Sequence, residues 1–208
     1  MIFKTFVVGP LEVNCYILGC ERSGEGIVID PGDDAPEVLE ALKDAQLSLK
    51  YILNTHGHFD HIGGVKRIKE ATGAPFLLHE ADLFLVEALT EQAMMFGMEP
   101  QESPEVDGFL NDGDEVDFGS YRVLVVHTPG HSPGGVCFHM GDKLFSGDTL
   151  FAGSIGRTDL MGGSYEGLIR SVRTRILPLG DEVRVYPGHG PETTIGWEQL
   201  YNPFLRDT

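Results

Sequence analysis

The stretch that decides the fold of this chain is Thr55-His56-Gly57-His58-Phe59-Asp60-His61. It follows an apolar run and places three imidazoles and one carboxylate within six residues. Alternate side chains of an extended segment point the same way, so His56 and His58 can bind one metal ion while Asp60 and His61 face a second. A solvated polar loop is the ordinary interpretation of a single His-x-His pair. Four potential ligands at this spacing favour a metal site instead.

Three further candidate ligands follow later strand-like runs, and each of them comes directly after a glycine. His131 follows the run 121–126, Asp148 follows 143–145, and His189 follows 183–186. The sequence therefore predicts two groups of ligands and a bridge: His56, His58 and His131 around one ion, Asp60, His61 and His189 around the other, and Asp148 between the two.

The donor set indicates the chemistry of such a site. Imidazole and carboxylate without thiolate suit zinc, with iron or manganese as alternatives, so we expect two divalent metal ions. Ions about 3.5–4 Å apart can lower the pKa of a shared water and polarise a carbonyl. The expected reaction is attack of a metal-bridging hydroxide on an ester-like carbonyl, with Asp60 as the catalytic residue that positions the nucleophile.

Two other residues have candidate roles beside the ligands. Asp30 ends the strand-like run 26–30 and can accept the second nitrogen proton of a ligand imidazole, or it can simply cap the turn before Gly32. Arg157 can bind an anionic group of a substrate, or it can form an ion pair with Asp159 in the same loop.

Composition bounds the class of protein. A chain of 208 residues can bury a full core, and we expect residues 1–208 to form a single domain. The formal net charge of −17 argues against a nucleic-acid partner, which normally requires clustered Lys and Arg. No apolar run approaches the length of a membrane span, so we expect a cytoplasmic protein without a membrane partner. The cysteines Cys15, Cys20 and Cys137 are expected to be buried thiols.

Strand-like and helix-like patterns alternate along the chain. Strands are predicted over 3–8, 14–18, 26–30, 51–53, 76–78, 121–126, 135–140, 143–145 and 183–186. Helices are predicted over 35–47 with Asp34 as N-cap, between His61 and Gly73, over 80–97, over 165–177 with Ser164 as N-cap, and around Trp197, Leu200 and Tyr201, which are expected to pack. This alternation in two similar halves predicts two sheets face to face with helices outside.

The ligand pattern His-x-His-x-Asp-His, followed by single His, Asp and His residues, resembles that of the metallo-β-lactamase-fold hydrolases, and the resemblance covers essentially the whole chain. It implies an α+β protein with a four-layer αββα sandwich, in which two mixed β-sheets lie between outer helices. It also implies the same seven ligands that the spacing predicts. The fold hosts many activities, so it does not define the reaction.

Several motifs resemble the glyoxalase II branch, which hydrolyses S-2-hydroxyacylglutathione thioesters. They are Asp148, where another branch usually has Cys, together with Asn14-Cys15-Tyr16, Ile29-Asp30-Pro31-Gly32 and Gly147-Asp148-Thr149-Leu150-Phe151. Asp159 stands where that branch has an aromatic, Gly190-Pro191 replaces an acidic-aromatic pair, and too few residues follow His189 for its helical domain. The chain is therefore similar to the short, single-domain glyoxalase II-like group, with a small-molecule thioester as the expected substrate.

Two alternatives to this function come from the same fold. Gly156-Arg157-Thr158-Asp159 resembles a motif of the persulfide dioxygenases, which use a single iron. A non-enzymatic or electron-transfer module is the other alternative, but no flavodoxin-like segment follows and both His56 and His58 are present. Oxygen consumption distinguishes the dioxygenase from a hydrolase, which releases a thiol without oxygen.

Overall fold

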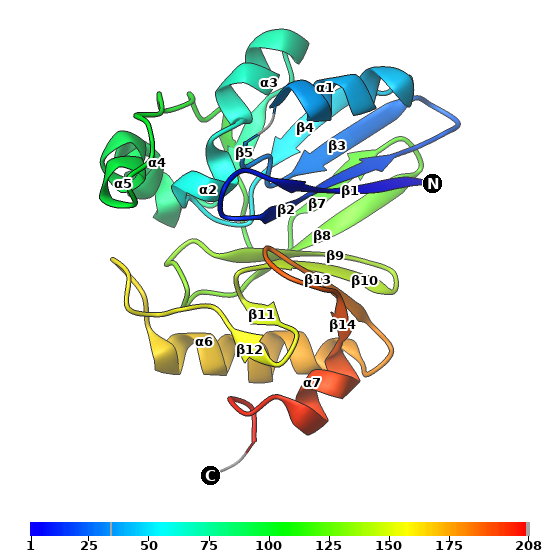
Figure 1. Ribbon diagram of the computed structural model, residues 1–208. Helices are drawn as coiled ribbons and strands as arrows, with labels where there is room; N and C mark the ends of the chain where they lie inside the picture. The colour runs from blue at the N-terminus through cyan, green and yellow to red at the C-terminus, as the bar shows by residue number, and fades with distance from the viewer. Residues whose placement is uncertain (34, 207–208) are drawn as a thin grey trace.

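The computed structural model describes residues 1–33 and 35–206 and has two β-sheets packed face to face between layers of helices (Figure 1). Each sheet contains six strands, and both mix parallel with antiparallel pairs. The predicted α+β class and αββα sandwich are confirmed. The proposed N-cap Asp34 lies outside the described residues.

The first sheet follows the order of the sequence. Its strands are β1 (Ile2–Val8), β2 (Val13–Gly19), β3 (Glu25–Ile29), β4 (Ser48–Leu53), β5 (Phe76–Leu78) and β6 (Gly108–Phe109). The first three pair antiparallel, and the pairs from β3 to β6 are parallel. Helices α1 (Ala35–Asp44) and α3 (Val65–Thr72) cover its outer face (Figure 1). Both bury apolar residues at helical spacing, as Val38 and Leu42 of α1 illustrate.

The second sheet has the strand order β14-β13-β10-β9-β8-β7. These strands are β7 (Glu115–Phe118), β8 (Tyr121–His127), β9 (Val136–Met140), β10 (Lys143–Gly147), β13 (Arg184–Pro187) and β14 (Thr193–Thr194). A small hairpin of β11 (Leu150–Phe151) and β12 (Ser154–Ile155) follows β10. Helix α6 (Tyr165–Ser171), with its extension through Leu179, and α7 (Ile195–Tyr201) cover the outer face (Figure 1).

Aromatic side chains fill part of the space between the two sheets. Tyr16 of β2 lies 5.0 Å from Phe145 of β10, and Phe3 of β1 lies 5.0 Å from Tyr186 of β13, measured between ring centroids. Phe145 is fully buried. This cluster joins the sheets through burial of large rings, which is the dominant favourable term in such packing.

The polar loops that follow β4, β10 and β13 lie at one edge of this sandwich. β10 pairs in parallel with β13, so the loops that follow these two strands start side by side, and Gly188 N donates to Gly147 O at 2.8 Å. Across the sheets, Val136 N donates to Thr55 O at 2.8 Å, and Val13 forms a bridge with His189. The ends of β4, β10 and β13 therefore meet at this edge.

Two predicted helices are interrupted. The helix predicted between His61 and Gly73 splits into α2 (Phe59–Ile62) and α3 at Gly63 and Gly64. A Cβ on Gly64 would lie 2.6 Å from Pro31 O, so this glycine allows two backbones to approach closely. The helix predicted over 80–97 contains a 3₁₀ turn (Glu80–Asp82), α4 (Leu83–Glu87) and α5 (Leu89–Met95).

The helix predicted near the C-terminal end is present as α7, but its packing face was assigned wrongly. Trp197, Leu200 and Tyr201 are each more than half exposed. The fully buried residues of α7 are Ile195 and Glu198, and the Glu198 carboxylate accepts from Gly153 N and from the side chains of Thr193 and Asn202. These bonds orient the opposite face of α7 towards the core.

Cys15, Cys20 and Cys137 are free and buried, so the expectation of buried thiols is confirmed. Within the described ranges, no helix is long and apolar enough to cross a membrane.

Replacing Phe145 by Ala should lower the free energy of unfolding by about 3–5 kcal/mol, because it opens a cavity between the sheets. Chemical denaturation of metal-free protein measures this change. Met94→Ala is the control, since Met94 is 60% exposed and its replacement should cost no more than about 0.5 kcal/mol. Equal losses in the two variants would contradict the packing described here.

Candidate metal centre

The backbone after β4 bends at Thr55 and His56, and it is extended at His58, which has φ −74° and ψ 148°. Helix α2 then begins at Phe59, so Asp60 and His61 occupy its first turn. The extended backbone expected for all four residues is therefore wrong for the second pair. The turn into α2 still directs Asp60 and His61 towards one another, with His61 Nε2 3.7 Å from Asp60 Oδ2.

Three buried imidazoles meet at the first group of predicted ligands. His131 Nε2 lies 3.2 Å from His56 Nε2 and 2.9 Å from His58 Nδ1. All three side chains are at most 6% exposed. Their ring nitrogens converge on one point, with a separation suited to a shared cation.

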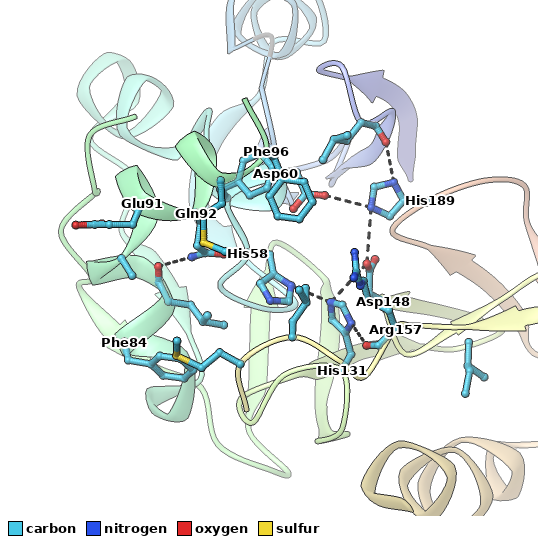
Figure 2. A pocket seen from close by; sticks show the side chains of 18 of the residues that line it. His58, Asp60, Phe84, Glu91, Gln92, Phe96, His131, Asp148, Arg157 and His189 are labelled. Carbon is cyan, nitrogen blue, oxygen red and sulfur yellow. Dashed lines mark hydrogen bonds and ion pairs between the residues drawn. The ribbon is translucent and has the colours of Figure 1, made fainter. Parts of the chain in front are cut away.

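The second group lies beside the first. His189 Nε2 lies 3.3 Å from Asp60 Oδ2, and Asp60, His61 and His189 together form a cluster of potential ligand atoms. Asp148 lies between the groups, because its carboxylate oxygens are 3.4 Å from His61 Nε2 and 3.6 Å from His131 Nε2. His56, His61 and Asp148 form a further possible cluster. The structure thus brings all seven predicted residues together, and Figure 2 shows five of them, His58, Asp60, His131, Asp148 and His189.

Electrostatics divide the histidines into two kinds. Burial and the neighbouring imidazoles lower the pKa of His56 well below its usual value, and burial with His131 lowers that of His58 to about 3. Burial also acts to lower the pKa of His61, but Asp60, Asp148 and Asp30 raise it well above its usual value. The pKa of Asp148 is far below the ordinary range. Burial acts to raise this pKa, but His61, His131 and His189 lower it by more. The carboxylates of Asp60, Asp148 and Asp30 therefore favour a positive charge at the position of His61.

Several donor atoms of the centre fit a divalent cation. His61 Nε2 and Asp148 Oδ1 are buried and make no hydrogen bond within the described part of the chain. Such buried polar atoms are costly unless something binds them. Neutral imidazole nitrogens that face one another, as in the first group, also need a proton or a cation between them. Nitrogen and carboxylate donors without sulfur suit zinc, iron or manganese.

Backbone carbonyls fix the outer nitrogen of two of these imidazoles. His131 Nδ1 lies 2.8 Å from Arg157 O, and His189 Nδ1 lies 2.9 Å from Leu11 O. A proton held on the outer nitrogen leaves the inner nitrogen free as a ligand. The contact of the Arg157 carbonyl with His131 could not be predicted from the sequence, because every residue has a backbone carbonyl whatever its side chain.

Asp30 supports both His61 and the loop that carries the ligands. Its Oδ2 lies 3.1 Å from His61 Nδ1, and it accepts from the backbone N and the hydroxyl of Thr55 at 2.7 Å each. Its φ of +51° is uncommon for a residue with a side chain. This strained conformation occurs at the strand end where the carboxylate contacts the centre.

Asp82 is a residue of the site that the sequence interpretation missed. It is fully buried and accepts from Gly57 N at 2.9 Å, Ser132 Oγ at 2.7 Å and Gly134 N at 2.6 Å. Burial raises its pKa, although these hydrogen bonds act to lower it. One carboxylate therefore links the loop of His56 and His58 to the loop of His131. The available signal was a single acid at the start of the apolar run 83–86.

The centre opens into a cleft of about 610 Å³. His58, Asp60, His131, Asp148 and His189 lie at its base, and residues of α4 and α5 form one wall (Figure 2).

Arg157 also lines the cleft, but its guanidinium lies against Asp159. Nε and Nη2 of Arg157 donate to the two carboxylate oxygens at 2.7 and 2.8 Å. The ion pair considered from the sequence is thus formed.

Comparison with known proteins agrees with this fold and site. The family model described as the metallo-beta-lactamase superfamily matches residues 8–189, and the chain belongs to that family. The hydroxyacylglutathione hydrolase GloC of Haemophilus influenzae is 40% identical, over 99% of this chain and 98% of that protein.

Two solved structures are similar along nearly their full lengths. The BLEG-1 B3 metallo-beta-lactamase has a TM-score of 0.92 and 40% identity, over 99% of this chain and 100% of that one. TTHA1623, solved in a di-iron-bound form, has a TM-score of 0.88 and 41% identity, over 97% of this chain and 100% of that one.

Replacing Asp82 by Ala should weaken zinc binding about 10- to 100-fold, because both ligand loops lose their common acceptor. Titration of the folded variant against a competing chelator measures the affinity. Glu80→Ala is the control, since Glu80 is exposed on the same 3₁₀ turn. Asp82→Asn keeps the volume of the side chain, and wild-type affinity in both Asp82 variants would remove this residue from the site.

Proposed function

We propose that this protein is a metal-dependent hydrolase that cleaves a small-molecule thioester, such as an S-2-hydroxyacylglutathione, and thus has a glyoxalase II-like activity. The observation that carries the proposal is the convergence of seven imidazole and carboxylate side chains at the base of an open cleft. Membership of the metallo-beta-lactamase superfamily and the 40% identity to a hydroxyacylglutathione hydrolase support it.

The residues would hold two divalent ions, with zinc as the first candidate and iron or manganese as alternatives. His56, His58 and His131 would bind one ion, Asp60, His61 and His189 the other, and Asp148 would contact both. When bound, such ions supply an ionised water at neutral pH and polarise a carbonyl group.

Asp60 has the position of the residue that orients the attacking water. It is partly exposed at the base of the cleft, and His61 and His189 lower the pKa of its carboxyl although burial acts to raise it. A carboxylate in this state accepts a hydrogen bond and fixes the direction of the water. The water oxygen bonds to the carbonyl carbon, the C–S bond breaks, and the products are a carboxylic acid and a thiol.

Arg157 is the proposed contact for an anionic group on the thiol carrier. It is the one arginine or lysine among the described residues that line the cleft, and its side chain is about half exposed. A carboxylate of the substrate would displace Asp159 from Arg157. Asp159 already accepts two hydrogen bonds from the guanidinium, one on each carboxylate oxygen, and a substrate carboxylate can accept the same two bonds.

Replacing Asp148 by Ala should abolish hydrolysis and reduce the metal content from two ions per chain to one or none, because both groups lose their shared ligand. Elemental analysis of the dialysed variant measures the stoichiometry. Asp142→Ala is the control, since Asp142 is exposed and pairs with Lys143. Two retained ions per chain would exclude the bridging assignment.

The class of reaction can be tested with two substrates. Metal-loaded protein should release thiol from S-lactoylglutathione without consuming oxygen, and treatment with a chelator should remove the activity. Oxygen uptake with glutathione persulfide, together with one iron per chain and no thiol release, would support the persulfide dioxygenase instead. The motif Gly156-Arg157-Thr158-Asp159 makes that enzyme the second candidate.

A further inference from the structure

The wall of the cleft formed by α4, α5 and the residues next to them, called here the α4–α5 wall, is mostly apolar. It contains Phe84, Leu85, Ala88, Met95 and Phe96, and Met161 also lines the cleft. Figure 2 shows Phe84 and Phe96 on this side of the cleft and Arg157 and His189 on the other. Leu11, Phe151, Ile155 and Leu160 also line the cleft, so the Arg157 end differs from the α4–α5 wall by its cationic side chain and not by a lack of apolar groups.

Several of these apolar groups are open to solvent. Met95 is 83% exposed, Met161 75% and Phe96 46%. Large exposed side chains that gather around a cavity are typical of ligand sites, in which apolar surface provides most of the contact. His58 and Asp60 line the same cavity, so a molecule long enough to extend from the metal centre can contact this wall.

The polar groups on this wall do not favour an anion. Gln92 is uncharged and donates one of its two amide N–H groups to Leu85 O at 2.7 Å. Glu91 adds an acid to the same wall. Arg157 lies at the other end of the cleft and is paired with Asp159. A charged carrier such as glutathione is therefore suited to the Arg157 end and not to the α4–α5 wall.

We propose that the α4–α5 wall binds the acyl half of the substrate and that this half is an uncharged aliphatic chain longer than a 2-hydroxyacyl group. The inference deepens the proposed thioester hydrolysis and rests on it for the reacting bond. A small hydroxyacyl group would leave most of the wall uncovered. Each methylene that leaves water for this wall should improve kcat/KM about fourfold.

The test uses N-acetylcysteamine thioesters with acetyl, butanoyl, hexanoyl and octanoyl groups, so that the carrier stays small and uncharged. The metal-loaded protein should show kcat/KM values that rise along the series. In a second series the acyl group is acetyl and the alkyl chain is on the thiol side. A rise with thiol length and none with acyl length would overturn the assignment of the wall to the acyl half.

The variant Met95→Glu places a charge on the wall without disturbing the core. It should lower the ratio of octanoyl to acetyl kcat/KM about tenfold. Met94→Glu is the matched control, because Met94 is exposed on the same helix but does not line the cleft. The same ratio in both variants would contradict the role of the wall.

Calorimetric binding of the corresponding amides separates this inference from the proposed function. Amides that bind more tightly with acyl length, without hydrolysis of any thioester, would uphold the wall and overturn the proposed reaction. Hydrolysis of thioesters with no dependence on acyl length, in either turnover or amide binding, would overturn the inference and leave the reaction intact.

Discussion

The structure depends on the close approach of buried imidazoles and carboxylates at one edge of a β-sandwich. Five histidines and two aspartates meet there, although burial of such groups is unfavourable unless their charges and lone pairs are compensated. The aromatic contacts between the sheets and the parallel pairing of β10 with β13 hold the loops at this distance. A divalent cation is the partner that suits these facing nitrogen and carboxylate ligand atoms best, because His61 Nε2 and Asp148 Oδ1 make no hydrogen bond among the described residues.

Support around the centre comes from positions far apart in the sequence. Asp30 contacts His61 and the Thr55 backbone, while Asp82 joins the backbone at Gly57 to that at Gly134. The carboxylates of Asp30 and Asp82 hold the middle of these loops in place, whereas the strands hold only the ends of the loops. Such partners usually matter nearly as much as the ligands, because they determine where the ligand atoms point. The site is thus assembled from both sheets and from the 3₁₀ turn before α4.

The ligand residues could be found from the sequence because local spacing defines them. His56, His58, Asp60 and His61 form one motif, and the later candidates follow apolar strand-like runs. Asp82 could not be found in this way, since its partners lie 25 and 52 residues away.

The orientation of α7 and the course of residues 80–97 were also beyond the sequence patterns. The buried Glu198 determines which face of α7 packs, and its partners include Gly153, 45 residues away. Periodicity alone favoured the apolar residues Trp197 and Leu200 for that face. The sequence allows Met95 to border a substrate channel but favours a packing role for it, and only the placement of α5 beside the metal centre puts Met95 and Phe96 on the wall of the cleft.

The most direct test of this account is anomalous X-ray scattering from crystals of zinc-loaded protein. We expect zinc peaks about 2.0–2.1 Å from ring nitrogens of His56, His58 and His131 and of His61 and His189, with Asp148 between them. Zinc bound elsewhere, or no zinc within coordination distance of these side chains, would contradict it.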